Sequence, residues 1–419
     1  MRLSCVRNAQ LENKMALIFI NRFYWPEEPA TAQLLTDLAE ALAATGEHVT
    51  IITSHDGRAE TPCEELHQGV RIRRVRSTRR GGKKLAGRAL DYAAFSLGAL
   101  ARLARTVRRN DTVVVMTDPP LLAIFAAGLA RWRGARIVFW VHDIYPELAM
   151  ALAGAKWLRI FRPMRDRAWR RAGACVVPGD DMAGFLAGRG VEKISIIPNW
   201  APAGLAPMPP AAADALREAW GLRGKFIAAY SGNLGRAHDL MPLLDTAAAL
   251  RAETDIVFVF IGDGAQRDAL ESSAQARGLH NVRFFPARPR AQLAETLALG
   301  DVHFVTLRPG CEQLVFPSKL HGIVAIGRPV FFVGPRDCAL AQLVAGRGMG
   351  AVFAREETTL LAEAIRSLHG DAARQRAWSE AAGKFHRETG GVERAVADWR
   401  KVLHAASSRL PHSVSNSVT

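Results

Sequence analysis

The sequence predicts an α/β protein with two doubly wound, parallel-sheet domains that face a cleft. Three observations support this architecture. The chain has 419 residues, which is too long for a single hydrophobic core. Short apolar runs recur along both halves and alternate with helical segments, as buried parallel strands do. A Pro- and Ala-rich stretch separates the two halves. Ligands of such sheets bind beyond the carboxyl ends of the strands, so we expect the functional site in the cleft.

Each half contains a series of apolar segments that we expect to be strands. In the first half they are residues 16–20, 48–54, 70–77, 111–120, 135–143 and 173–181. In the second half they are residues 226–232, 255–264, 281–287, 302–307, 328–334 and 349–354. Most lack polar alternation, which indicates burial on both faces. The segment 70–77 alternates Val or Ile with Arg, as an edge strand would.

The domain boundaries follow from this pattern. The expected parts are a disordered extension (1–14), an N-terminal acceptor- and membrane-side domain (15–198), a linker (199–225), a C-terminal donor domain (226–385), a helix that packs back on the N-terminal domain (386–406) and a disordered tail (407–419). Both sheet domains are expected to be Rossmann-like.

Composition restricts the function classes. The net charge is +15, and residues 71–109 hold thirteen Lys or Arg against one acid, Asp91. Such a charge favours an anionic partner, namely nucleic acid, anionic lipid or a phosphate-bearing substrate. Five cysteines without a CxxC pair argue against a disulfide framework or zinc site and suit a reducing cytoplasm. No apolar run reaches about 18 uncharged residues, so we expect no transmembrane helix.

Two basic segments could contact a membrane. Residues 85–109 place Leu90 and Leu97 on one helical face, with Arg102 and Arg105 on the other. This pattern fits an ordinary core helix or a helix on an anionic membrane surface. Residues 155–171 hold Trp157, Phe161 and Trp169 among six arginines, which suits a lipid interface. Because no nucleic-acid recognition motif is present, we do not expect nucleic acid as a partner.

The common catalytic and nucleotide-binding motifs are absent. The sequence contains no GxGxxG after the first strand, no GxxxxGK[ST], no HExxH, no GxSxG and no cluster with metal-ligand spacing. Ordinary dinucleotide binding, P-loop hydrolysis and a metal site are therefore not predicted. The remaining candidates lie at the ends of the expected strands.

The first candidate is SGNLGRAHD, residues 231–239. Gly232, Asn233 and Gly235 form a turn after a strand, and Arg236 and His238 follow. Glycine allows close backbone approach, and arginine holds phosphate oxygens in bidentate fashion. The segment therefore predicts a phosphate site, although a tight turn with a solvated arginine also fits it.

A Gly-Asp-Gly turn lies after the next expected strand. Gly262, Asp263 and Gly264 could let a nucleotide base or ribose approach the backbone. The motif is common in α/β proteins and carries little weight alone.

The N-terminal half offers an opposite wall. His142, Asp143 and Glu147 follow the strand at 135–143, where charged groups at a strand end indicate a site. A helix cap by Asp143 and a buried, satisfied histidine would explain the same residues. Glu28 and Thr31 lie in the loop after the first strand, and Thr31 is expected to cap the helix that follows.

The segment FPSKLHG, residues 316–322, places a lysine at a predicted helix start. Ser318 is a suitable N-cap residue between Pro317 and Lys319, and Leu320 follows. A cation at a helix N-terminus opposes the helix dipole unless an anion is bound there. The segment therefore fits either an ordinary capped helix or a phosphate site.

Six segments together carry a resemblance to a known family. YWPEEPATAQLLTDLAEAL, VHDIYPE, IIPNW, YSGNLGRAHDL, FIGDGAQRDAL and FPSKLHGIVAIGRPV occur in the order found in retaining GT-B glycosyltransferases of the GT4 type. Over residues 15–405 the chain most resembles the fucosyl- and N-acetylfucosaminyltransferases of bacterial exopolysaccharide and O-antigen (lipopolysaccharide) biosynthesis.

The resemblance implies roles for the candidates. Arg236 and Lys319 resemble the cations that clamp the diphosphate of a UDP- or GDP-linked sugar, so no cofactor or metal is expected. Pro317, Ser318 and Leu320 resemble the backbone that meets diphosphate and ribose. His142 resembles the histidine that contacts the transferred sugar, a deoxyhexose or N-acetylhexosamine. Transfer is expected to proceed with retention, without an enzymic nucleophile.

The implied acceptor is a polyprenyl-diphosphate-linked saccharide. Glu28, Thr31, Asp143 and Glu147 are expected on the acceptor side of the cleft. Such an enzyme would be cytoplasmic and peripheral on the inner face of the cell membrane, with an anionic membrane surface as a partner.

The sequence departs from the family pattern at one motif. Many GT4 enzymes carry E-x7-E before this helix, with one glutamate on the sugar and the other on the ribose. Those positions are Leu314 and Gly322 here, and Glu312 is out of register. Two alternatives to a transferase therefore stay open. One is a nucleotide-sugar epimerase of the same fold, and the other is a non-catalytic basic protein that binds membrane or nucleic acid.

Overall fold

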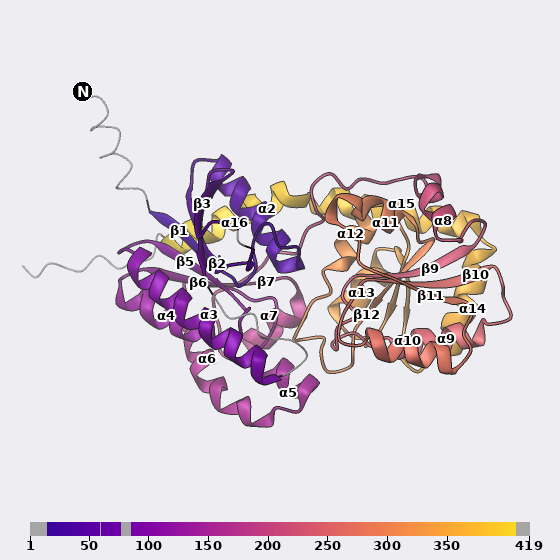
Figure 1. Ribbon diagram of the computed structural model, residues 1–419, viewed down its shortest axis with the longest axis horizontal. Coiled ribbons are helices and arrows are strands. Elements are labelled where there is room, and N and C mark those ends of the chain that lie inside the picture. Colours follow the sequence, from indigo (N-terminus) through magenta and orange to yellow (C-terminus); the bar gives the residue numbers. More distant parts are fainter. Residues whose placement is uncertain (1–14, 59, 77–84, 408–419) are drawn as a thin grey trace, which may run out of the picture.

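The protein consists of two α/β lobes that lie side by side (Figure 1). The computed structural model describes residues 15–58, 60–76 and 85–407. The predicted disordered extension 1–14 and all but the first residue of the predicted tail 407–419 lie outside these residues.

The N-terminal lobe contains an eight-stranded sheet. Its strands are β1 (Ala16–Ile20), β2 (His48–Ser54), β3 (Glu64–His67), β4 (Val70–Val75), β5 (Thr112–Met116), β6 (Arg136–Trp140), β7 (Ala174–Val177) and β8 (Ile194–Ile196). The order is β3-β4-β2-β1-β5-β6-β7-β8, and only β3 is antiparallel to its neighbour. The alternating segment at 70–77 is thus next to the edge, because the short, half-exposed β3 covers it.

Helices cover both faces of this sheet. They are α2 (Ala30–Ala44), α3 (Leu85–Thr106), α4 (Leu122–Trp132), α5 (Glu147–Ala153), η1 (Lys156–Phe161), α6 (Arg162–Arg170) and α7 (Asp180–Ala187). Helices α3, α4 and α6 lie together on one face and α2 on the other (Figure 1). The central strands are buried on both faces, which explains their continuous apolar sequence.

The C-terminal lobe contains a six-stranded, wholly parallel sheet. Its strands are β9 (Phe226–Ser231), β10 (Ile256–Ile261), β11 (Val282–Phe285), β12 (Val302–Thr306), β13 (Val330–Val333) and β14 (Gly350–Phe353), in the order β11-β10-β9-β12-β13-β14. All six coincide with predicted strand segments.

The helices of this lobe also form two layers. They are η2 (Pro210–Ala213), α8 (Asp214–Ala219), α9 (Met241–Ala249), α10 (Arg267–Ala276), η3 (Arg290–Gln292), α11 (Leu293–Ala298), α12 (Lys319–Ala325), α13 (Ala339–Gly346), α14 (Thr358–His369) and α15 (Ala372–Thr389). The final helix, α16 (Gly391–Ser407), packs on the N-terminal lobe. Apolar residues of α9, α10 and α14 share one core, and those of α11, α12 and α13 lie on the opposite face of the sheet. The prediction of two parallel-sheet α/β domains is therefore confirmed.

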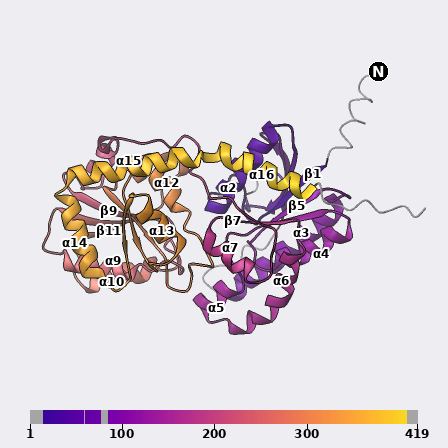
Figure 2. The same cartoon turned by 180° about the vertical axis from the view of Figure 1, so that it is seen from behind.

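The last helix returns to the first lobe. Figure 2 shows α15 on the C-terminal lobe and α16 along the N-terminal one. The helices part at Gly390, whose φ of 72° ends α15 in the left-handed conformation. Trp399 of α16 is fully buried, with its ring centroid 4.8 Å from that of Trp140. Residues 391–407 are therefore part of the N-terminal core.

Helix α3 buries a face that only partly coincides with the apolar face that the sequence predicts. Phe95 and Leu103 are buried, whereas Leu90 is 48% and Leu97 70% exposed. Asp91, expected on the polar face, is buried. The helix is apolar on more than one side, and helical periodicity cannot tell which side the sheet covers.

No helix in the described part of the chain is long and apolar enough to cross a membrane.

Candidate functional site

A cavity of about 650 Å³ lies between the two lobes. The C-terminal lobe contributes the turn after β9 and the start of α12. The N-terminal lobe contributes the start of α2, the segment after β6, and residues 199–200. The cavity thus lies at the carboxyl ends of strands from both sheets, where the doubly wound architecture predicts a ligand.

Lys319 is the most unusual residue in this cavity. Its Nζ atom is buried and has no hydrogen-bond partner within the described residues. The ammonium lies 3.5 Å from the centroid of the Tyr230 ring, which is a cation–π contact. Burial lowers the pKa of Lys319 well below its usual value. A buried cation without an anionic partner is costly, so the site is complementary to an anionic ligand.

The turn after β9 lies beside this lysine. Gly232 has a φ of 125°, and a Cβ atom built there would lie 3.7 Å from Lys319 Nζ. Glycine therefore leaves the backbone open to a ligand next to the ammonium. Asn233 and Gly235 of the same turn also line the cavity.

The predicted Gly-Asp-Gly motif supports this turn from behind. Gly262, Asp263 and Gly264 do not line the cavity. A Cβ atom at Gly262 would lie 2.1 Å from the carbonyl oxygen of Gly232, and the Leu234 N–H donates to the Asp263 carbonyl oxygen at 2.8 Å. The structure thus places the motif as a brace for the turn, whereas the sequence predicted contact with base or ribose.

Arg236 and His238 differ in their surroundings. Arg236 lines the cavity, is exposed, and has no ion-pair partner among the described residues. His238 Nδ1 lies 2.8 Å from the carbonyl oxygen of Thr306. Burial, with a smaller effect of Lys319, lowers the pKa of His238 to about 3. The neutral His238 ring therefore holds the loop in place, while Arg236 is available to a ligand.

The start of α12 only partly matches its prediction. Ser318 occupies the N-cap position, but its side chain makes no capping hydrogen bond. Pro317 and Ser318 line the cavity, whereas Leu320 is fully buried and does not. Leu320 therefore anchors α12 in the core, and the expected contact of this backbone segment with diphosphate and ribose stays a prediction.

The segment after β6 brings His142 and Asp143 to the opposite wall. His142 Nε2 is buried and has no hydrogen-bond partner among the residues that the structure describes, and the ring centroid lies 4.9 Å from that of Trp140. Burial lowers the pKa of His142 to about 4, so the ring is neutral at pH 7. Burial, followed by the charge of Asp118, raises the pKa of Asp143 to about 7.

Glu147 lies elsewhere. Its carboxylate bonds to both terminal nitrogens of Arg165 and to Arg162 Nε at 2.9 Å, and it does not line the cavity. The predicted acceptor-side role therefore does not fit its position. The ion pairs fasten α5 to α6, and sequence spacing gave no sign of them.

Glu28 and Thr31 line the cavity, but Thr31 does not cap the helix. Helix α2 begins at Ala30, with Pro29 at the N-cap position. Proline fixes its own φ near the helical value, and the N-cap lies two residues before the predicted one.

Sequence reasoning missed a polar contact across the cavity. Asp37 accepts a hydrogen bond from Arg290 of the other lobe at 2.9 Å and from the indole N–H of Trp200 at 3.3 Å. Asp37 and Trp200 line the cavity. Asp37 lies inside a regular helix, where one acid among polar residues carries no signal.

Neither position of the E-x7-E motif supplies a carboxylate. Gly322 lines the cavity, and Leu314 is buried.

The predicted membrane residues are unequal in exposure. Trp157 is 66% exposed, and its ring lies 6.4 Å from that of the partly buried Phe161. Arg105 is exposed, whereas Arg102 forms an ion pair with Glu64. Trp169, also expected at a lipid interface, is buried beneath Arg165.

Known proteins resemble the chain in both lobes. Residues 31–200 match the family described as glycosyl transferase 4-like domain, and residues 213–385 match glycosyl transferases group 1. The putative colanic acid biosynthesis glycosyl transferase WcaI of Escherichia coli K12 is 27% identical over 342 residues, which are 76% of this chain and 83% of that protein.

Two further proteins extend the comparison. A GDP-mannose-dependent alpha-mannosyltransferase of Mycobacterium tuberculosis (strain CDC 1551 / Oshkosh) is 26% identical over 328 residues, 75% of this chain and 78% of that protein. The crystal structure of Anabaena Alr3699/HepE in complex with UDP superposes with a TM-score of 0.71. It covers 93% of this chain and 100% of the Anabaena chain at 16% identity, which shows a shared fold.

The two family matches lie one on each lobe, and the cavity lies between them. The chain is therefore a glycosyltransferase with the GT-B fold, formed by a glycosyl transferase 4-like domain and a group 1 domain.

Proposed function

We propose that this glycosyltransferase transfers a sugar from a nucleoside-diphosphate sugar to a lipid-linked saccharide in cell-surface polysaccharide biosynthesis. The observation that carries the proposal is the buried ammonium of Lys319 in the cavity between the lobes, which has no hydrogen-bond partner in the described part of the chain. An anionic ligand would offset the cost of burying this charge. Glycosyltransferases that use nucleoside-diphosphate sugars transfer the sugar from such an anion, the diphosphate.

The diphosphate would lie between Lys319, Arg236 and the open backbone at Gly232. All three line the same cavity, and Arg236 can bond phosphate oxygens in bidentate fashion. UDP and GDP are the candidate leaving groups, since the Anabaena structure contains UDP and the mycobacterial relative is GDP-mannose-dependent. A deoxyhexose or N-acetylhexosamine donor, as in the fucosyl- and N-acetylfucosaminyltransferase branch, is part of the proposal.

Transfer would proceed with retention and without a metal or cofactor. The bond between the sugar and the leaving diphosphate breaks, and the new bond to the acceptor oxygen forms on the same face. The acceptor's proton passes to the diphosphate. Lys319 and Arg236 stabilise the charge that develops there, which is the role a metal ion would otherwise have. The neutral His142 lines the cavity, and its Nε2 has no hydrogen-bond partner among the described residues, so this side chain would contact the transferred sugar.

The acceptor would enter from the N-terminal lobe. Glu28, Thr31 and Asp143 line that wall, and the acidic groups can accept hydrogen bonds from sugar hydroxyls. A polyprenyl-diphosphate-linked saccharide is the proposed acceptor. The name of the Escherichia coli relative, a putative colanic acid biosynthesis enzyme, supports a place in polysaccharide assembly.

The surface of the N-terminal lobe has features that suit binding to a membrane. Exposed large apolar side chains of α3, α4, η1 and α6 are Leu90, Leu97, Phe125, Trp132, Trp157, Ile160 and Met164. Helices α3, α4 and α6 lie together in Figure 1. Exposed arginines of the same layer are Arg105, Arg133, Arg159 and Arg167. Apolar and aromatic side chains among arginines suit the headgroup region of an anionic bilayer. We propose that this layer, the membrane layer, rests on the cytoplasmic face of the membrane.

The donor proposal is tested by thermal shift with UDP, GDP, dTDP and ADP in the absence of metal. One nucleoside diphosphate should raise the melting temperature of the wild type, and Arg236→Ala should lose the shift. Arg223→Ala is a matched control, because Arg223 is exposed and lies outside the cavity. If none of the four ligands raises the melting temperature, or if Arg236→Ala responds like the wild type, the proposal that Arg236 and Lys319 bind the diphosphate is wrong.

The membrane proposal is tested by sedimentation with vesicles of phosphatidylglycerol and phosphatidylcholine. The double variant Trp157→Ser/Ile160→Ser should lose binding to the anionic vesicles. Met241→Ser/Leu360→Ser changes two exposed apolar residues of the other lobe and should bind normally. Equal sedimentation of the wild type and both variants would rule out the membrane layer as the contact.

A further inference from the structure

Residues 311–316 extend from the C-terminal lobe into the N-terminal lobe, and we name this segment the latch. It follows β12 and precedes α12. The Ile144 N–H donates to the carbonyl oxygen of Leu314 at 2.9 Å. Asp143 and Val315 pair as an isolated antiparallel β-bridge. The backbone of the latch therefore pairs with the N-terminal lobe at the end of β6.

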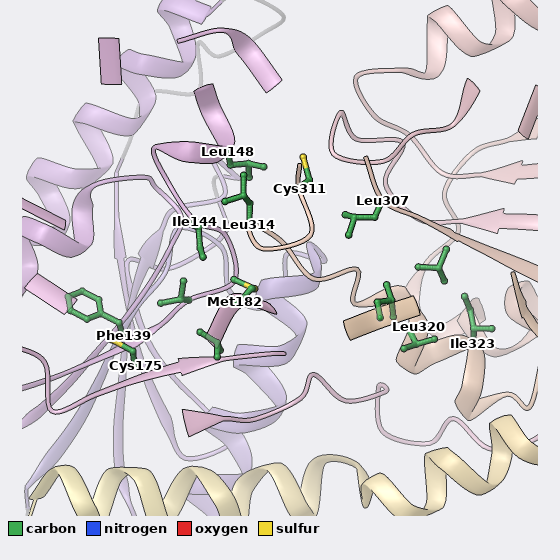
Figure 3. Close-up of a cluster of buried hydrophobic side chains, with 14 of the residues drawn as sticks. Phe139, Ile144, Leu148, Cys175, Met182, Leu307, Cys311, Leu314, Leu320 and Ile323 are labelled. Atoms are coloured by element: carbon green, nitrogen blue, oxygen red, sulfur yellow. The ribbon is translucent and has the colours of Figure 1, made fainter. Parts of the chain in front are cut away.

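The Leu314 side chain extends this contact into the core of the other lobe. Leu314 is 6% exposed and belongs to the same buried cluster as Ile144, Leu148 and Met182 of the N-terminal lobe. Figure 3 shows Leu314 beside Leu148 and Ile144, at the tip of a loop that comes from the other lobe. An apolar side chain at this position removes from water a surface that both lobes would otherwise expose.

Phe316 fits closely against the same lobe. A Cβ atom at Gly179 would lie 3.0 Å from the Phe316 ring, so a larger residue there would require the ring to move by a few tenths of an ångström. Nearby, the carboxylate of Asp181 accepts a hydrogen bond from the N–H of Ala339 at 2.8 Å. The two lobes therefore meet in a close-packed contact that also includes a hydrogen bond.

The paired segments also carry the proposed active-site groups. His142 and Asp143 lie directly before Ile144 on one side. Pro317, Ser318 and Lys319 directly follow the latch on the other. The pairing of Leu314 with Ile144 therefore fixes how His142 stands relative to Lys319.

We propose that Leu314 is a positioning residue. Its contact with the N-terminal lobe fixes the position of His142, which would contact the sugar, relative to Lys319, which would bind the diphosphate. The inference rests on the proposed function. Leu314 does not line the cavity, so it acts through the segments on either side and not by touching the donor. At the position where many relatives have a sugar-contacting glutamate, this chain uses an apolar contact between the lobes.

The test compares Leu314→Ala with Leu279→Ala. Leu279 is a suitable control because it is also 6% exposed but packs inside the C-terminal core. Loss of alignment should lower kcat of Leu314→Ala by about tenfold or more, since small misplacements of reacting groups are costly. The Kd of the nucleoside diphosphate should change less than about threefold, because the clamp residues lie within one lobe. Leu314→Met should recover most of kcat, and Leu279→Ala should keep kcat.

A second measurement needs no turnover. Small-angle X-ray scattering should give a larger radius of gyration for Leu314→Asp than for the wild type and Leu279→Ala, because a buried carboxylate at the contact would separate the lobes. A kcat of Leu314→Ala equal to the wild type, or scattering curves that are the same for all three proteins, would overturn the role of Leu314. If the wild type transfers no sugar while Leu314→Asp still expands, the proposed function fails and the contact between the lobes stands.

Discussion

Replacing Lys319 by methionine tests two effects of its buried charge separately: the gain in diphosphate binding and the cost to the stability of the fold. Methionine keeps the length of the side chain and its contact with Tyr230 but removes the charge. We expect Lys319→Met to weaken nucleoside diphosphate binding and to leave the fold intact. The free energy of unfolding should stay equal or rise, since the Lys319 ammonium is buried without a partner within the described residues.

The magnitude of the binding loss follows from the geometry. A hydrogen bond between an ammonium and a charged phosphate oxygen contributes about 1.5–3 kcal/mol. A loss of roughly 3 kcal/mol corresponds to binding that is about a hundredfold weaker. Transfer should fall by at least as much, because the charge on the leaving diphosphate grows in the transition state.

The pH dependence gives an independent test. The pKa of Lys319 is lowered in the folded protein, so between that value and 10.5 the unfolded chain binds more protons. The wild type should therefore gain stability as pH rises through this window, while Lys319→Met lacks this gain. A bound diphosphate favours the charged lysine and raises its pKa again. Wild-type affinity should then fall as pH rises above the lowered pKa of the free protein.

Isothermal titration calorimetry with the nucleoside diphosphate from the thermal-shift screen measures both effects. Titrations in buffers of different ionisation enthalpy report the protons taken up on binding, and urea unfolding from pH 7 to 10 reports stability. Wild-type affinity in Lys319→Met, or a loss of stability at pH 7, would refute the assignment of Lys319 as a clamp.

Three further changes probe other parts of the site. Glu147→Gln should cost about 2 kcal/mol of unfolding free energy in urea, because buried Arg165 loses one of its two carboxylate partners and keeps only Asp166, while nucleoside diphosphate affinity stays unchanged. The raised pKa of Asp143 stabilises the fold below about pH 4, and this contribution is lost as pH rises through about 7. Asp143→Asn should therefore flatten the stability profile over that range; a parallel profile would contradict it. Gly262→Ala puts a Cβ atom 2.1 Å from the Gly232 oxygen and should weaken both stability and ligand binding. Gly278→Ala, with open space around its Cβ position, should lower stability alone.

The sequence by itself determined the six strands of the C-terminal sheet, six of the eight strands of the N-terminal sheet and most of the donor wall; the short strands β3 and β8 were not predicted. Buried parallel strands need continuous apolar segments, and glycine-rich turns mark where the backbone takes unusual conformations. These are local requirements, so each leaves its mark within a few residues. For the same reason Gly232, Arg236 and Lys319 could be predicted as one site, since all follow strands whose carboxyl ends meet at one edge.

The tertiary structure decided which face each segment presents and what it meets. Periodicity placed Leu90 and Leu97 on a face of α3, but only the packing of that helix on the sheet left them exposed. Glu147 was a plausible cavity residue until α6 supplied Arg165 as its partner. Leu314 and Ile144 are far apart in the sequence and meet only when the two lobes come together. Contacts between distant segments depend on how whole domains pack, and no local pattern of residues encodes that arrangement.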